Sequence, residues 1–138
     1  MKIAIRYYTR SGNTQKLAEA VAEALSVEAK DVSHPLTERV DILFLGASYY
    51  GFDADDAVKR FITENREHIG KIVCIGTSAM LRSMRKPIAR VASKVGVAVA
   101  DEEFHCRGRF GRIHRDRPNE KDIGEVKEFA LGILNSSK

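Results

Sequence analysis

Short apolar segments alternate with amphipathic helical segments along the whole chain, and this alternation limits the fold more than any other feature. The expected strands span residues 3–8, 27–32, 40–47, 71–77 and 97–106, and the expected helices span residues 14–25, 55–67, 87–95 and 119–134. Strands that alternate with helices in this way form a parallel sheet with helices on both faces. The sequence therefore predicts an α/β domain with five parallel strands.

The character of each apolar segment predicts its place in the sheet. Residues 40–47 and 71–77 are nearly continuous apolar runs, as expected for strands buried on both faces, whereas residues 27–32 suit an edge. Right-handed crossovers leave few arrangements of five parallel strands. We expect a three-layer sandwich with the strand order 2-1-3-4-5. Ligands of such sheets bind beyond the carboxyl ends of the strands, next to the first strand.

Length and composition limit the class of protein. The chain has 138 residues, of which 43% are hydrophobic, and this suits one domain over residues 1–138. No apolar run is long enough for a membrane span, and the first residues do not resemble a signal peptide. Two cysteines, Cys74 and Cys106, favour neither a disulfide framework nor a zinc site. These features predict a cytoplasmic protein with reduced thiols.

The loop after the first strand has the composition of an anion site. Its hydroxyl groups can donate to phosphate oxygens, its glycine permits a positive φ, and the helix that follows presents N–H groups and the positive end of its dipole. The predicted phosphate-binding residues are Thr9, Arg10, Ser11, Gly12, Asn13 and Thr14. The alternative is that Ser11 or Asn13 only caps the helix.

This loop also carries a resemblance to a known family. Residues 8–14, Tyr-Thr-Arg-Ser-Gly-Asn-Thr, resemble the FMN-phosphate loop of flavodoxins and flavodoxin-like proteins, and the alternation of strands and helices is similar over almost the whole chain. The resemblance implies a flavodoxin-like fold and FMN as the cofactor. The glycine-rich motifs of dinucleotide-binding proteins and of P-loop proteins are absent from the sequence.

Two further loops correspond to the flavin-ring loops of that family. The resemblance implies that Ser48, Tyr49, Tyr50 and Gly51 contact the isoalloxazine ring, and that Thr77, Ser78 and Ala79 reach its pyrimidine edge. The alternative for the tyrosines is ordinary packing at a turn. No aromatic residue lies between Thr77 and Phe104, so Met80 or Leu81 covers the outer face of the ring, or that face is open.

The most basic part of the chain follows the last strand. Arg107, Arg109 and Arg112 belong to a run of five arginines, and the chain as a whole has a formal net charge of +4. We expect an anionic redox partner protein, or a small carboxylated acceptor, to dock there. The alternative is a solvated basic loop. Nucleic acid is not expected as a partner, because neither a recognition helix nor an aromatic platform accompanies the run.

The predicted function is electron transfer by bound FMN, from or to a redox partner or a small acceptor. The flavin carries the chemistry, so no side chain is predicted to be catalytic and no metal is expected. Two alternatives stay open. One is a flavin-dependent reductase or oxidase of a quinone or tetrapyrrole-like substrate, since Gly46-Ala47-Ser48 before an aromatic residue resembles menaquinone-dependent protoporphyrinogen oxidase. The other is a non-redox module that binds an anion or a protein.

Overall fold

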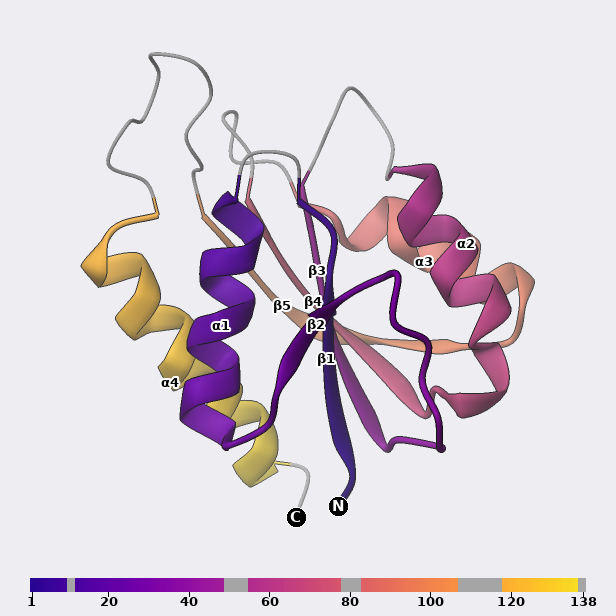
Figure 1. The fold of residues 1–138 in the computed structure, drawn as a ribbon, viewed down its shortest axis with the longest axis horizontal. Helices are drawn as coiled ribbons and strands as arrows, with labels where there is room; N and C mark the ends of the chain where they lie inside the picture. The colour runs from indigo at the N-terminus through magenta and orange to yellow at the C-terminus, as the bar shows by residue number, and fades with distance from the viewer. Residues whose placement is uncertain (10–11, 49–54, 78–82, 107–117, 137–138) are drawn as a thin grey trace.

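The computed structural model describes residues 1–9, 12–48, 55–77, 83–106 and 118–136. Figure 1 shows a twisted sheet between two layers of helices. The strands are β1 (Ile3–Tyr7), β2 (Ala29–Asp31), β3 (Ile42–Ser48), β4 (Lys71–Thr77) and β5 (Ala98–Cys106). The helices are α1 (Asn13–Leu25), α2 (Asp56–Glu64), α3 (Arg85–Lys94) and α4 (Glu120–Ser136), with a short 3₁₀ helix at Arg66–His68.

The strands form one parallel sheet in the order β2-β1-β3-β4-β5, which confirms the predicted class and order. The register places Tyr7 of β1 beside Gly46 of β3, and Ser48 of β3 beside Thr77 of β4. All carboxyl ends of the strands therefore meet at one edge of the sheet. Among the described helices, none is long and apolar enough to cross a membrane.

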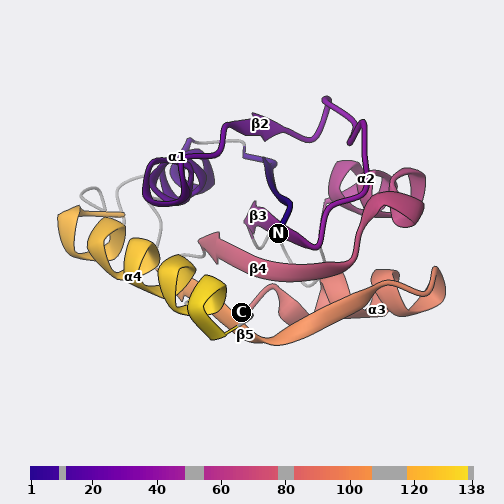
Figure 2. The same ribbon diagram turned by 90° about the horizontal axis from the view of Figure 1, so that it is seen from below.

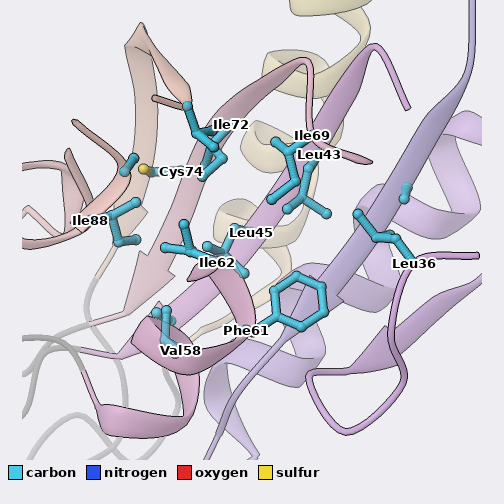
Figure 3. Close-up of a cluster of buried hydrophobic side chains, with 14 of the residues drawn as sticks. Leu36, Leu43, Leu45, Val58, Phe61, Ile62, Ile69, Ile72, Cys74 and Ile88 are labelled. Carbon is cyan, nitrogen blue, oxygen red and sulfur yellow. The ribbon is translucent and has the colours of Figure 1, made fainter. Parts of the chain in front are cut away.

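Each face of the sheet packs against one pair of helices (Figures 1 and 2). Because side chains alternate along a strand, β3 presents Leu43 and Leu45 to the layer of α2 and α3, and Ile42 and Phe44 to the layer of α1 and α4. Figure 3 shows the first of these cores, in which Phe61 of α2 lies among residues of the sheet. The strands predicted from continuous apolar runs are thus buried on both faces.

The last strand differs from a regular pairing with β4. Residues 72 and 74 of β4 pair with residues 99 and 103 of β5, so β5 has extra residues at this point. The acidic residues that weaken the strand pattern lie here. Arg85 of α3 donates to the carbonyl of Ala100 at 2.8 Å and to Asp101 Oδ1 at 3.0 Å, and Ser83, just before α3, donates its hydroxyl to Glu103 at 2.5 Å. The bulge therefore has local polar support.

Two predicted helix boundaries are wrong by a few residues. α2 ends at Glu64 rather than at residue 67, because the chain tightens into the 3₁₀ helix at Arg66–His68. α3 begins at Arg85, two residues before Pro87. Proline is tolerated there because the N–H groups of the first turn have no partner within the helix.

Candidate cofactor site

The candidate site lies where the strands end and α1 begins. Tyr7, Ser48 and Thr77 are the last residues of β1, β3 and β4, and Cys106 is the last of β5. The N–H group of Tyr8 donates to the carbonyl of Gly46 at 2.9 Å, which ties the chain leaving β1 to β3. Figure 1 shows the N-terminus of α1 at this same edge. The predicted loops therefore start from neighbouring strand ends.

The turn before α1 is built around Gly12. This residue is the N-cap of the helix, with a φ of +88°, and its N–H group donates to Thr9 Oγ1 at 2.8 Å. Glycine has no side chain with which to accept the N–H groups of the first turn, and a positive φ is unfavourable for most other residues. Asn13 is the first helical residue, so the alternative in which Asn13 caps the helix is wrong. The N-terminus of α1 is suited to an anion.

Residues predicted from two separate loops meet inside this edge. Thr14 Oγ1 and Thr77 Oγ1 lie 3.0 Å apart and share a hydrogen bond, and both side chains are buried. Thr14 belongs to the first turn of α1, whereas Thr77 ends β4. The hydrogen bond fixes the first turn of the helix relative to the central strands.

Two glycines within the strands allow this close packing. A Cβ atom at Gly46 would lie 2.8 Å from Thr14 Cγ2 and 3.2 Å from Tyr7 Cβ. A Cβ atom at Gly76 would lie 2.5 Å from the carbonyl oxygen of Ala47. Their role was not predicted from the sequence. The available signal was a glycine within a buried strand, which often marks a close approach of another part of the backbone.

A groove with a volume of about 880 Å³ adjoins the first loop. It is lined by α2, by Asp31 at the end of β2 and residues of the segment that follows, and by Tyr7, Tyr8 and Thr9 at the end of β1. Burial, and then the charges of Asp31 and Glu19, raise the pKa of Tyr7. Hydrogen bonds from the hydroxyl and N–H groups of Ser33 lower the pKa of Asp31. This groove was not predicted from the sequence, because its residues come from segments far apart in the chain.

Comparisons with known proteins agree with this geometry. A family model described as a flavodoxin domain matches residues 4–113. The chain belongs to the flavodoxin family. Among solved structures, a flavodoxin from the domain Archaea superposes with a TM-score of 0.79 at 18% identity, covering 99% of this chain and 98% of that one. A short-chain flavodoxin associated with a non-canonical PDU bacterial microcompartment gives a TM-score of 0.75 at 18% identity, with both chains fully covered.

Two other relatives show the range of proteins with this fold. An uncharacterized protein of Methanocaldococcus jannaschii is 27% identical over an alignment that covers 90% of this chain and 91% of the relative. The rubredoxin:oxygen oxidoreductase of Desulfovibrio gigas gives a TM-score of 0.73 at 14% identity, covering 98% of this chain but 35% of that one. The flavodoxin fold therefore occurs alone and within longer chains.

The structure places some of the predicted site residues of this chain and not others. It describes Thr9, Gly12, Asn13, Thr14 and Thr77, together with the backbone of Ser48 at the end of β3. The predicted residues Arg10, Ser11, Tyr49, Tyr50, Gly51, Ser78 and Ala79 lie outside the described residues, as do Met80, Leu81, Arg107, Arg109 and Arg112.

Both cysteines, Cys74 and Cys106, are buried as thiols rather than joined in a disulfide. Burial raises the pKa of Cys74 to about 12, and the nearby charge of Glu103 adds to the effect. Thiol reactivity requires the thiolate, so Cys74 stays protonated and unreactive at neutral pH. Cys106 ends β5 next to the site, with 4% of its surface exposed. Cys74 is therefore not placed to act as a nucleophile.

Proposed function

We propose that this protein binds FMN at the carboxyl edge of its sheet and transfers electrons to a redox partner or a small acceptor. The observation that carries the proposal is the first turn of α1, which opens at this edge behind a glycine N-cap and is fixed by the bond between Thr14 and Thr77. Family membership supports the same function. The prediction that the protein is cytoplasmic stays a prediction.

The phosphate of FMN fits the loop before α1. We assign it to the N–H groups and hydroxyls of residues 9–14, namely Thr9, Arg10, Ser11, Gly12, Asn13 and Thr14. No side chain of Gly12 stands between a ligand and the helix terminus, and the dipole of α1 favours a dianion there. A monoester phosphate therefore needs no lysine at this position.

The two other loops would hold the ring. Ser48, Tyr49, Tyr50 and Gly51 are assigned to the isoalloxazine face, and Thr77, Ser78 and Ala79 to the pyrimidine edge. The described ends of these loops support the assignment, because Ser48 and Thr77 are paired neighbours in the sheet. The ends of β3 and β4, after which the two loops begin, therefore lie next to each other at the edge where α1 begins (Figure 1).

Bound FMN supplies the one- and two-electron chemistry, and the protein binds and orients it. The chain itself contributes position: β1, β3 and β4 fix the starts of the loops, and the Thr14–Thr77 bond fixes the helix relative to them. No nucleophile or general acid is required. The thiol of Cys74 is consistent with this role, since it is buried and protonated.

The partner is proposed to be anionic. Arg107, Arg109 and Arg112 are the assigned contacts, and the described part of the chain adds positive charge on α3, whose charged residues Arg85, Lys86, Arg90 and Lys94 are all basic. Attraction between opposite charges raises association rates and weakens with salt. Electron transfer to an acidic partner should therefore slow as ionic strength rises, and transfer to a neutral acceptor should not.

The first test is the visible spectrum of the purified protein after FMN is added and the sample is desalted. Retained oxidised-flavin bands support the proposal, and a colourless protein favours the non-redox alternative. The double variant Ser11→Ala and Thr14→Ala should weaken FMN binding by at least tenfold, because hydrogen bonds to a charged group are lost and the bond from Thr14 to Thr77 that fixes the first turn of α1 is lost as well. The control is Ser93→Ala with Thr63→Ala, whose hydroxyls bond helix carbonyls elsewhere on the molecule.

A further inference from the structure

The groove beside the first loop is built into the fold. Its outer wall, residues 32–36, is held by buried polar side chains that reach across from other elements. Arg6 Nε of β1 donates to the carbonyl of His34 at 2.8 Å, and the N–H group of Leu36 donates to Asn65 Oδ1 at 2.9 Å. Arg6 and Asn65 are 8% and 4% exposed. Burying a guanidinium group is costly, and burial lowers the pKa of Arg6. The wall is therefore fixed before any ligand arrives.

A carboxylate stands at the mouth of this groove. Asp31 is the last residue of β2 and pairs with Tyr7 of β1. Its Oδ1 atom accepts the N–H group of Ser33 at 2.8 Å and also the Ser33 hydroxyl, and these bonds lower the pKa of Asp31. Within the described residues, no hydrogen bond is made to Oδ2. Asp31 is thus an ionised, fixed acceptor at neutral pH.

The position of Asp31 suggests what it accepts. In parallel α/β sheets that bind dinucleotides, an acidic residue about 20 residues after the glycines of the first loop accepts the ribose 2′-hydroxyl. Asp31 has a similar spacing from Gly12, although the glycine-rich motif of those proteins is absent from this chain, and Asp31 lines the same groove as Thr9. A carboxylate oxygen without a protein donor suits the adjacent hydroxyls of a ribose.

The other sides of the groove suit the base and the phosphate. Tyr8 supplies aromatic surface and Val32 adds an apolar wall, whereas Phe61 borders the groove from the core with 3% of its surface exposed. Planar rings pack well against such surfaces. Thr9 borders the N-terminus of α1, which favours phosphate, whereas the other charged lining residues are two acids, Asp31 and Glu64, and one base, Arg60. We therefore place the 5′-phosphate of a ribonucleotide toward α1.

We propose that this groove binds the ribonucleoside part of a nucleotide, with Asp31 on the ribose and Tyr8 beside the base. The inference rests on the proposed function only for the phosphate end. The nucleotide is either separate from FMN or joined to it, as the AMP part is in FAD. The contacts with Asp31 and Tyr8 would be the same in both cases, and binding measurements distinguish them.

The test uses isothermal titration calorimetry on the full chain. AMP, FMN and FAD are each titrated into flavin-free protein. AMP binding to the flavin-free protein supports a separate nucleotide, which would compete with FMN for the N-terminus of α1. An affinity for FAD at least tenfold above that for FMN supports the joined form. The Asp31→Asn variant should bind the ligand that shows the effect about tenfold more weakly, as expected for a lost hydrogen bond to a charged group. That ligand is AMP for a separate nucleotide, or FAD relative to FMN for the joined form.

Two controls separate this effect from others. The asparagine side chain of the Asp31→Asn variant retains an oxygen for the N–H group of Ser33, so the turn is kept. Glu38→Gln removes an exposed carboxylate that bonds Lys2 at 2.7 Å, at the amino end of β1, and should change neither nucleotide nor FMN affinity. If the separate arm binds, 2′-deoxy-AMP should bind about tenfold more weakly than AMP, because Asp31 loses one hydroxyl donor.

The inference is overturned if AMP does not bind and FMN and FAD bind equally. It is also overturned if Asp31→Asn leaves the nucleoside contribution unchanged while the protein stays folded. These results leave the proposed function standing when FMN is retained. Conversely, a chain that fails to retain FMN but binds AMP through Asp31 refutes the proposed function and supports the groove.

Discussion

The two alanine variants Gly46→Ala and Gly124→Ala should change stability in opposite directions. Gly46 is buried in β3, and an added Cβ atom would lie 2.8 Å from Thr14 Cγ2. Carbon atoms normally pack at about 3.5–4.0 Å, so Thr14 must move by about 0.7 Å or more. Thr14 is fully buried and its hydroxyl is bonded to Thr77, so it has little room to move. Gly124 is exposed in α4, and nothing lies within 4 Å of its added Cβ atom.

The magnitudes follow from these contacts. Overpacking a core costs about 1–3 kcal/mol, and replacing glycine by alanine within a helix or strand recovers about 0.5–1 kcal/mol. Gly46→Ala should therefore lower the free energy of unfolding by about 1–2 kcal/mol. Gly124→Ala should raise it by about 0.5–1 kcal/mol, since only the backbone effect operates.

Urea unfolding of the FMN-free protein measures both changes. With a slope of about 1.5–2 kcal/mol/M for a chain of this size, the two midpoints should differ by about 1 M. Gly46→Ala should also weaken FMN binding, because the first turn of α1 is displaced. A Gly46→Ala protein as stable as the Gly124→Ala protein would refute the close packing of α1 on β3. Normal FMN affinity in a destabilised Gly46→Ala protein would argue against the first turn as the phosphate site.

Three further predictions concern single groups. Gly12→Ala and Gly96→Ala each place alanine at a positive φ in open space, so each should lower the free energy of unfolding in urea by about 1–2 kcal/mol. Only Gly12→Ala should also weaken FMN binding, as measured by fluorescence titration. Cys74 should react with a thiol reagent at pH 8 only at the rate of unfolding, because its pKa is raised to about 12; fast labelling of the native protein would contradict this. Folding lowers the pKa of Asp31, so its carboxylate stabilises the protein above the ordinary pKa of an aspartate. This stabilisation is lost as the pH falls through the pKa of the folded state. The melting temperature of Asp31→Asn should therefore depend less on pH in acid than that of the unchanged protein.

The elements with strong local patterns could be predicted from the sequence. The run predicted at residues 40–47 is β3 at Ile42–Ser48, and the strand predicted at residues 71–77 is β4 with those bounds. Continuous burial on both faces leaves a pattern that needs no knowledge of the partner segments. The weak edge segment at residues 27–32 forms only the short strand Ala29–Asp31.

The features that could not be predicted depend on contacts between distant residues. Arg6 lies within an apolar strand pattern, and its role appears only when its guanidinium group reaches the carbonyl of His34, 28 residues away. The bond between Thr14 and Thr77 spans 63 residues, and it follows from the register of the strands. The sequence identified both threonines as site residues but not that they bond to each other. Periodicity reports which face a residue takes, and not which residue it meets there.

The geometry of the candidate site depends on its glycines, which have no side chain, as much as on its polar side chains. Gly12 leaves the helix terminus open, Gly46 admits Thr14 against β3, and Gly76 admits the backbone of Ala47. Removing one hydroxyl from the first loop removes one contact with the ligand. Adding a Cβ atom at Gly46 or Gly76 displaces the strands and the helix that position all of the contacts. We therefore expect the strand glycines to tolerate substitution less well than the individual hydroxyls. A set of single variants, Thr9→Ala and Ser11→Ala against Gly46→Ala and Gly76→Ala, measures this directly: larger losses of FMN affinity for the hydroxyl variants would contradict the argument.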